Sequence, residues 1–331
     1  MVAQPESEPS HLVAGVDTHT DTHTLAILTA NGNTLRTETF TADKRGYDQL
    51  IATLRNAGNV AMIGVEGTNS YGAGLARALT AAGYTVKEVL RPTRRVRRMH
   101  GKSDAIDAVE AARTLIANRG VSEAKDSTTP AESLRCLLTA RTQLITTATR
   151  LINCITALLV TAPENVRAKY RGQATPTIIK RLAASRPGNQ LDNPHTAVMH
   201  ALQHLARSYQ DAKDRADHLE QDLRTILTSH YPQVLAIYGA GPIVAAQLVI
   251  TASGNPHRIR NEAAFATLCG AAPIPASSGR TNRHRLNRGG DRHANSALHR
   301  IALIRLQHDP RTQAYAARKI KEGKSKKDTL R

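Results

Sequence analysis

Short apolar runs separated by polar turns dominate the first 125 residues of the chain. Runs of this length are typical of buried β-strands, and the sequence predicts five strands, at 12–17, 22–28, 34–40, 60–67 and 84–90. Asn31-Gly32-Asn33 marks a hairpin between the second and third strands. Elsewhere apolar residues recur at helical spacing, which predicts three helices, at 47–58, 71–83 and 103–120.

The order of these elements predicts the fold of residues 12–125. Three antiparallel strands come first, and parallel strands alternating with helices follow. This is the order of an RNase H-like (RuvC-like) α/β domain. Residues 1–11 are expected to form a disordered leader.

Beyond residue 125 the pattern becomes helical. Long amphipathic stretches at about 130–162 and 195–229 flank a segment broken by four prolines. They predict a helical hairpin or coiled-coil arm over 126–232. A C-terminal, mainly helical domain is expected over 233–310, followed by a basic tail at 311–331.

Positive charge is concentrated in two segments of a strongly basic chain. The sequence has 45 Lys+Arg against 27 Asp+Glu, a net charge of +18. Residues 91–102 hold six basic residues and no acid, and residues 256–331 hold 17 basic and five acidic residues. Together these segments carry the whole excess, which is the footprint of phosphate-backbone binding, although a single charge run is also typical of a solvated surface. The arginines expected to contact nucleic acid are Arg94, Arg95, Arg97, Arg98, Arg280, Arg283, Arg285, Arg288 and Arg292.

Several function classes are disfavoured by composition. No apolar run approaches the roughly 20 residues of a membrane span, and the first residues lack the pattern of a secretion signal. The three cysteines provide neither a disulfide framework nor zinc-ligand spacing, so a reducing cytoplasm is expected. Aromatic residues make up 3% of the chain, which argues against a sheet that stacks RNA bases on aromatic rings.

Four carboxylates stand out by their positions. Asp17 and Glu66 end predicted strands, where α/β sheets form their ligand sites. Asp104 and Asp107 begin a predicted helix and project from one of its faces. A shared hard divalent cation, most commonly Mg²⁺, would relieve the repulsion between the four acids. Each residue also has a structural explanation, as a turn former, an ion-pair partner, a helix cap or a favourable first-turn charge.

Other ligand motifs fit the N-terminal region less well. Gly101-Lys102-Ser103 resembles the end of a P-loop, but Val96 stands where the motif needs a glycine. An actin-like ATPase would need a glycine-rich turn after the first strand, and DTHTDTHT follows here. His19 and His23 have the i, i+4 spacing of metal ligands, but on a hairpin we expect both to face solvent.

The C-terminal region contains a candidate nucleophile and a candidate phosphate-binding turn. Ser277-Ser278-Gly279 precedes a dense Arg/His stretch that could hold a scissile phosphate while a serine attacks it. A polar turn with ordinary DNA-backbone contacts is the alternative. The Gly-x-Gly turn at 239–241 opens an apolar helix, as in a helix-hairpin-helix motif or an ordinary glycine-capped helix. A tyrosine recombinase using Tyr315 would leave the N-terminal acids unexplained.

Five segments in this order resemble the DEDD-type transposases of the IS110 insertion sequences and the related Piv-type invertases. The resemblance covers roughly residues 12–310. The segments are GVDTH (15–19), GVEGTNSYG (64–72), GKSDAIDA (101–108), IYGAGPIVAAQL (237–248) and PIPASSGRTNRHRLNRGGDRHAN (273–295).

This resemblance implies a RuvC-like domain that binds Mg²⁺ through Asp17, Glu66, Asp104 and Asp107. It also implies a catalytic serine directly before a glycine, which matches Ser278, with Ser277 as the alternative. The partners it implies are donor and target double-stranded DNA and a non-coding bridge RNA. It further implies a dimer or tetramer in which the acids of one subunit and the serine of another share an active site.

Three functions follow from the sequence. The first is an Mg²⁺-dependent, RNA-guided transposase that works through a serine-linked DNA intermediate in the cytoplasm, at the nucleoid. The second is a RuvC-like junction resolvase that cuts with metal-activated water. The third is a nucleic-acid-binding protein without catalysis, in which the acids are structural.

Overall fold

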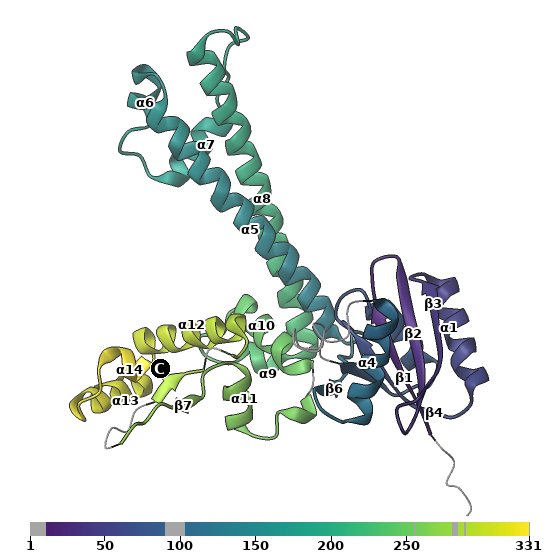
Figure 1. Ribbon diagram of the computed structural model, residues 1–331. Helices are drawn as coiled ribbons and strands as arrows, with labels where there is room; N and C mark the ends of the chain where they lie inside the picture. Colours follow the sequence, from purple (N-terminus) through teal and green to yellow (C-terminus); the bar gives the residue numbers. More distant parts are fainter. Residues whose placement is uncertain (1–10, 90–102, 255, 280–283, 288, 331) are drawn as a thin grey trace, which may run out of the picture. The chain divides into compact units, whose positions relative to one another are not determined.

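The computed structural model divides into two compact units, residues 1–127 and 128–331 (Figure 1). It describes residues 11–89, 103–254, 256–279, 284–287 and 289–330. The expected leader therefore lies almost wholly outside the described residues, and so does the basic segment at 91–102.

The N-terminal unit is built on a six-stranded mixed sheet in the order β3-β2-β1-β4-β5-β6. The strands are β1 (Leu12–Thr18), β2 (Thr22–Thr29), β3 (Thr34–Thr41), β4 (Val60–Glu66), β5 (Val86–Val89) and β6 (Val121–Glu123). β1, β2 and β3 pair antiparallel, and β1, β4 and β5 run parallel. All five predicted strands are present. The short antiparallel edge strand β6 was not predicted.

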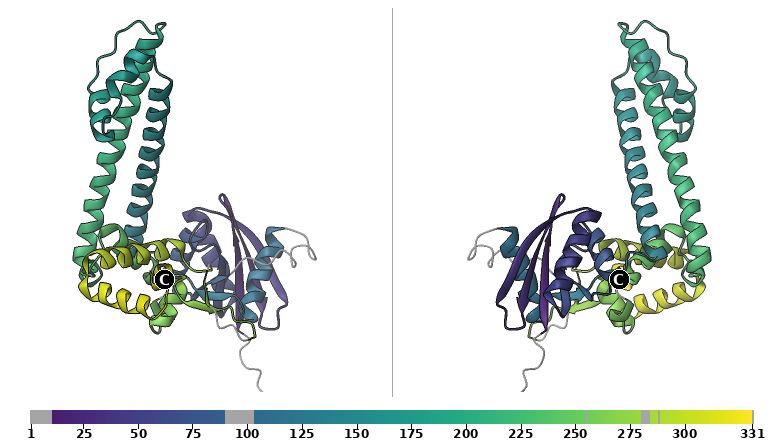
Figure 2. Two further views of the ribbon diagram at one scale, coloured as in Figure 1. Left: turned by 90° about the vertical axis from the view of Figure 1, so that its left-hand side faces the viewer. Right: turned by 90° about the vertical axis from the view of Figure 1, so that its right-hand side faces the viewer.

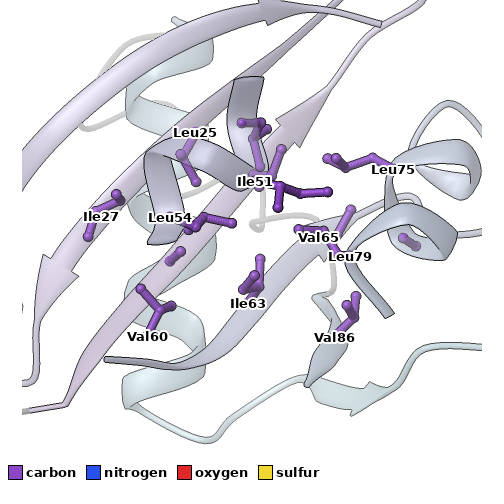
Figure 3. Packing of buried hydrophobic residues seen from close by; sticks show 14 of the residues in the cluster. Leu25, Ile27, Ile51, Leu54, Val60, Ile63, Val65, Leu75, Leu79 and Val86 are labelled. Atoms are coloured by element: carbon purple, nitrogen blue, oxygen red, sulfur yellow. The ribbon is translucent and has the colours of Figure 1, made fainter. Parts of the chain in front are cut away.

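Helices cover both faces of this sheet. α1 (Lys44–Ala57) and α2 (Ala73–Ala81) pack on one face, where Leu54 and Leu79 meet Ile63 of β4 (Figure 3). α4 (Asp104–Ile116) packs on the other face against β1 and β2. The aliphatic core follows from the scarcity of aromatic residues in the sequence. The mixed α/β prediction for this region is confirmed.

A glycine allows α4 to lie unusually close to the first strand. A Cβ atom at Gly15 would stand 2.3 Å from the carbonyl oxygen of Ala108 and 2.3 Å from the amide nitrogen of Ala112, both in α4. The small side chains of α4 at this crossing are themselves buried. Any larger residue at position 15 would force the helix away from the strand.

The C-terminal end of α4 differs from the prediction. The sequence predicts a helix up to Gly120, but α4 ends at Ile116. Asn118 and Gly120 then adopt positive φ angles of 48° and 73°, which turn the chain into β6.

The C-terminal unit begins with two long paired helices. α5 (Pro130–Thr161) and α8 (Pro194–His230) lie side by side as an arm (Figure 2). Arg141 of α5 donates to Glu220 of α8 at 2.7 Å. The proline-rich connector contains α6 (Glu164–Tyr170) and α7 (Thr175–Ala183), which pack on the far end of the arm around Leu182 and Leu202.

α5 is an exception to the expectation that the chain lacks a long apolar segment. By length and composition alone this helix could cross a membrane; one 18-residue window has a mean hydropathy of 1.5, and 11% of it is buried. Threonines interrupt the apolar run in the sequence. In the helix, however, hydroxyls such as those of Thr142, Thr146 and Thr149 donate to the carbonyl four residues earlier. In the structure this helix pairs with the largely polar α8.

Short helices and a two-stranded sheet complete this unit. The helices are α9 (Pro232–Leu235), α10 (Pro242–Ser253), the 3₁₀ turn η1 (Pro256–Arg258), α11 (Glu262–Leu268), α12 (Arg292–His308), α13 (Pro310–Lys321) and α14 (Lys326–Leu330). β7 (Pro273–Pro275) pairs antiparallel with β8 (His284–Leu286). The predicted helical character is confirmed, and the small sheet was not predicted because β7 has two prolines in three residues.

Candidate functional site

Two neighbouring parallel strands bring the first two candidate acids to one edge of the sheet. Asp17 lies at the end of β1 and Glu66 is the last residue of β4, and the residues before them, Val16 and Val65, are register partners. Thr18 Oγ1 donates to the backbone oxygen of Glu66 at 2.7 Å. This bond ties the two strand ends together at the edge where ligand sites form.

The first turn of α4 supplies the other two acids. Ser103 caps this helix by accepting a hydrogen bond from the amide of Ile106 at 3.3 Å, which fixes where the turn begins. Asp107 is buried, whereas the side chain of Asp104 is 47% exposed. The helix thus presents one shielded carboxylate and one that is open to solvent.

His19 joins the acids of the two elements. Its Nε2 lies 3.2 Å from Asp17 Oδ2 and 3.2 Å from Asp104 Oδ1. The ligand atoms of these three residues all lie within 4.8 Å of one another. The side chain of His19 is 44% exposed, so it reaches solvent as expected, but its contact with the acids was not expected. The turn after β1 directs the imidazole back over the strand end, and hairpin spacing does not specify that direction.

The electrostatics of Asp17 report on all four acids. Burial raises the pKa of Asp17 above its usual value, and His19 acts in the opposite direction. The negative charges of Glu66, Asp107 and Asp104 raise it further. The other three carboxylates therefore lie within electrostatic range of Asp17, and ionising Asp17 beside them is unfavourable without a cation.

One buried oxygen tests whether a cation fits. Asp17 Oδ2 is buried and lies 3.2 Å from His19 Nε2, but it accepts no hydrogen bond from the described residues, although a buried carboxylate oxygen normally has a hydrogen-bond partner. It is directed toward the same space as Asp104 Oδ1 and His19 Nε2. Several carboxylate oxygens with one imidazole nitrogen form a donor set that suits a divalent cation. The residues present fit such an ion.

His23 does not belong to this cluster. It is fully buried, and its ring stacks on that of Tyr47 with centroids 5.7 Å apart. Burial lowers the pKa of His23, which favours the neutral ring. The expectation that His23 faces solvent is wrong, because both faces of β2 are covered by helices. Its contacts are those of a core residue.

The candidate nucleophile lies in an exposed turn of the C-terminal unit. Ser277 and Ser278 follow β7 and are both exposed. Gly279 adopts a φ of 55°, the left-handed conformation that favours glycine. The hydroxyl of Ser278 therefore sits in a sharp turn that is open to a large substrate.

The predicted arginine contacts are only partly described. Arg285 lies in β8 and Arg292 begins α12, and both are exposed. The others lie outside the described residues: Arg94, Arg95, Arg97, Arg98, Arg280, Arg283 and Arg288. Their contacts with nucleic acid remain predictions.

Sequence reasoning overlooked Asp291, which organises the end of the basic stretch. Its carboxylate accepts hydrogen bonds from Thr251 Oγ1 at 2.7 Å and from the amide of His293 at 2.8 Å. Burial opposes its ionisation, but these bonds hold the pKa of Asp291 below its usual value. Asp291 thereby caps α12 and links it to α10. An acid directly after two glycines and before a helical stretch was the signal available in the sequence.

Comparison with known protein families agrees with this geometry. A model of DEDD transposases of the IS110 type matches residues 14–162, which include all four acids. A second model, described as Transposase IS116/IS110/IS902 family, matches residues 232–317, which include the serine turn. No curated protein matches the chain. Since two models of one family cover most of the sequence in the expected order, the chain belongs to the IS110 family of transposases, enzymes that cleave DNA and transfer its strands.

Proposed function

We propose that this transposase is an Mg²⁺-dependent, RNA-guided recombinase that moves an insertion sequence through a serine-linked DNA intermediate. The observation that carries the metal-dependent part is the buried Asp17 Oδ2, which accepts no hydrogen bond from the described residues and lies beside Asp104 and His19. The strand order, with three antiparallel strands followed by parallel ones, supports an RNase H-like fold for the N-terminal unit.

Asp17, Glu66, Asp104 and Asp107 would hold the cation in this proposal, with His19 at its margin. Bound there, Mg²⁺ would neutralise the acids and polarise the scissile phosphate. The protein's own contribution is to fix the carboxylates before the substrate arrives. Two strand ends and one capped helix turn hold them, so little reorganisation is needed on binding.

Ser278 would supply the nucleophile. A bond forms between Ser278 Oγ and the scissile phosphorus, and the bond from phosphorus to one bridging oxygen breaks. The serine proton leaves, and the released oxygen takes up a proton to become a hydroxyl. Rejoining reverses these changes with a hydroxyl from another strand. The exposed turn supports this role because the Ser278 hydroxyl is open to a phosphodiester, and Ser277 is the adjacent alternative.

The basic segments would hold the nucleic acids. Arg285 and Arg292 are exposed in the C-terminal unit, and the arginines at 94–98 add a second cluster in the sequence. We propose donor and target DNA as substrates, and as guide a non-coding RNA encoded beside the gene. Omitting that RNA from a reaction with purified protein should abolish recombination, and restoring it should rescue activity.

Covalent trapping tests the serine chemistry. Labelled DNA and wild-type protein should give an adduct on denaturing gels, and peptide mapping should place it at Ser278. Ser278→Ala should lose the adduct, and Ser277→Ala should keep it. An adduct at Tyr315 would show a tyrosine recombinase. Metal-dependent cutting without any adduct would show a junction nuclease that uses water.

Mixing inactive subunits tests whether an active site is shared. We propose a tetramer in which the acids of one subunit act with the serine of another. Asp104→Ala and Ser278→Ala chains should each be inactive alone, and together they should regain part of the activity. If the mixture stays inactive while each variant still assembles, the site is complete within one chain.

A further inference from the structure

A cavity of about 250 Å³ opens where α5, α10 and α12 of the C-terminal unit meet. Its floor is apolar: Leu138 of α5, Val244 of α10 and Ala297 of α12 are each at most 8% exposed. These residues belong to the cores on either side of α10. The floor is therefore a fixed surface formed by three packed helices.

Polar and basic side chains surround this floor. Arg141, His293 and Arg300 stand at the wall together with Gln247 and Ser296. Among the described residues that line the cavity, none is acidic. Positive charge thus borders an apolar surface, an arrangement that an anionic ligand with a flat apolar part would complement.

The donors and acceptors on the wall are already partly oriented. Arg141 Nη2 donates to Glu220 at 2.7 Å, while its Nε is buried and has no hydrogen-bond partner among the described residues. Gln247 Nε2 donates to Thr251 Oγ1 at 3.2 Å, and this bond fixes the orientation of the Gln247 amide group. His293 follows Asp291 at the start of α12, and its backbone amide donates to the Asp291 carboxylate at 2.8 Å.

We propose that this cavity binds one unpaired nucleotide of a nucleic-acid strand. The apolar floor covers a face of the base, and the His293 ring and the guanidinium groups provide planes on which a base stacks. Arg300 holds the adjoining phosphate, and Gln247 and Ser296 meet the edge of the base. A cavity smaller than the roughly 300–1,000 Å³ typical of drug-sized ligands suits a single base rather than a longer segment.

The proposal is independent of the metal centre, because all lining residues belong to 128–331. The unpaired nucleotide can come from RNA or from melted DNA, and the same chemistry would bind either. A side chain from a second copy of the protein is the competing occupant.

The test uses the full-length protein with short single-stranded DNA or RNA that carries one central 2-aminopurine. Ser296→Phe places a ring in the cavity from an exposed position on α12, so the core is untouched. His299→Phe is its matched control, since His299 is exposed on the same helix but does not line the cavity. Arg300→Gln removes the charge without filling the space, and Arg311→Gln on α13 is its control.

Wild-type protein should change the 2-aminopurine fluorescence, and Ser296→Phe should abolish that change and weaken single-strand binding about tenfold. Arg300→Gln should weaken binding severalfold, and it keeps the test valid if Ser296→Phe fails to fold by circular dichroism. Both controls and the affinity for duplex DNA should stay within about twofold of wild type. Comparing the DNA oligonucleotide with the RNA oligonucleotide identifies which nucleic acid supplies the nucleotide.

Equal losses in Ser296→Phe and His299→Phe would overturn the proposal, because the helix surface rather than the cavity would then matter. It would also be overturned if both cavity variants bind like wild type. A change in oligomeric mass by light scattering, with unchanged nucleotide binding, would assign the cavity to a second copy of the chain instead. Substituting the acids would abolish strand cleavage without changing these binding results. The two proposals can therefore be disproved separately.

Discussion

The two candidate reactive groups of this transposase are held in opposite ways. The acids of the N-terminal unit sit on strand ends and a capped helix turn, and three of the four are buried. Ser278 of the C-terminal unit lies in an exposed turn beside a glycine with positive φ. One group is preorganised by the core of its unit, whereas the other sits at the surface.

This difference separates the roles of the two regions. Burial raises the pKa of Asp17, and the negative charges of the other three acids raise it further, so the N-terminal unit maintains an unfavourable charge arrangement that a bound cation would relieve. A serine in an exposed turn destabilises the fold little, and it can move together with a large substrate. Cation-dependent activation of the phosphate is therefore expected to depend on the first region, and nucleophilic attack on the substrate on the second.

The largest expected effect is on cleavage. Asp107→Ala or Asp104→Ala should reduce strand cleavage in Mg²⁺ by about 10³-fold or more, because the cation loses a ligand. Affinity for DNA should change less than about twofold, since we expect it to arise from the basic segments. Gel assays of cleavage and of binding on the same samples measure both. Wild-type cleavage in these variants would rule out the metal site.

For the basic segment at 91–102 we expect the reverse: weaker nucleic-acid binding rather than a direct loss of catalysis. Replacing Arg94, Arg95, Arg97 and Arg98 with Gln should flatten the log–log dependence of duplex binding on salt by roughly 0.9 for each phosphate that the segment no longer neutralises. Fluorescence anisotropy over a salt series gives the slope. Arg36→Gln is the control, because Arg36 already pairs with Glu38 on β3. An unchanged slope would mean that these arginines touch no phosphate.

A smaller effect is expected from His19. If its imidazole reaches the cation, Mn²⁺ bound to the protein should show nitrogen coupling in pulsed electron paramagnetic resonance. His19→Ala should remove that coupling and weaken Mn²⁺ binding about tenfold, with less effect on Mg²⁺, which prefers oxygen ligands. His11→Ala, at the opposite end of β1, should change neither. Bound Mn²⁺ without nitrogen coupling in the wild type would assign His19 a purely ionic role.

The smallest effect concerns stability without metal. Because the pKa of Asp17 is raised in the folded state, its contribution to stability is fully present at low pH and is lost as the pH rises through that pKa. Asp17→Asn, which cannot ionise, should therefore melt about 2–4 °C higher than wild type at neutral pH in EDTA. The difference in melting temperature between Asp17→Asn and wild type should disappear as the pH is lowered.

Adding Mg²⁺ should reverse this order, since only the wild type gains full binding stabilisation. Differential scanning calorimetry at three pH values, with and without Mg²⁺, would reveal the crossover. If Asp17→Asn is less stable than wild type in EDTA at neutral pH, the carboxylate has a structural role.

The sequence predicted the parts of this fold that have strong periodicity. The apolar runs located β1 to β5, and because Asp17 and Glu66 end two of them, their common edge was predictable. The contact of His19 with the acids was not predictable, because the periodicity of the sequence does not indicate where a side chain points once a strand has ended. β7 was missed because Pro273 and Pro275 are poor strand formers.

The closeness of α4 to β1 at Gly15 has a consequence for which ions this enzyme can use. That contact sets the distance between the strand carrying Asp17 and the helix turn carrying Asp104 and Asp107. A methyl group at position 15 would act as a wedge, widening the gap that the carboxylates span and shifting preference from a small cation such as Mg²⁺ toward the larger Ca²⁺, whose bonds to oxygen are longer by about 0.3–0.5 Å. The missing side chain of Gly15 is therefore expected to favour the binding of a small cation over a larger one.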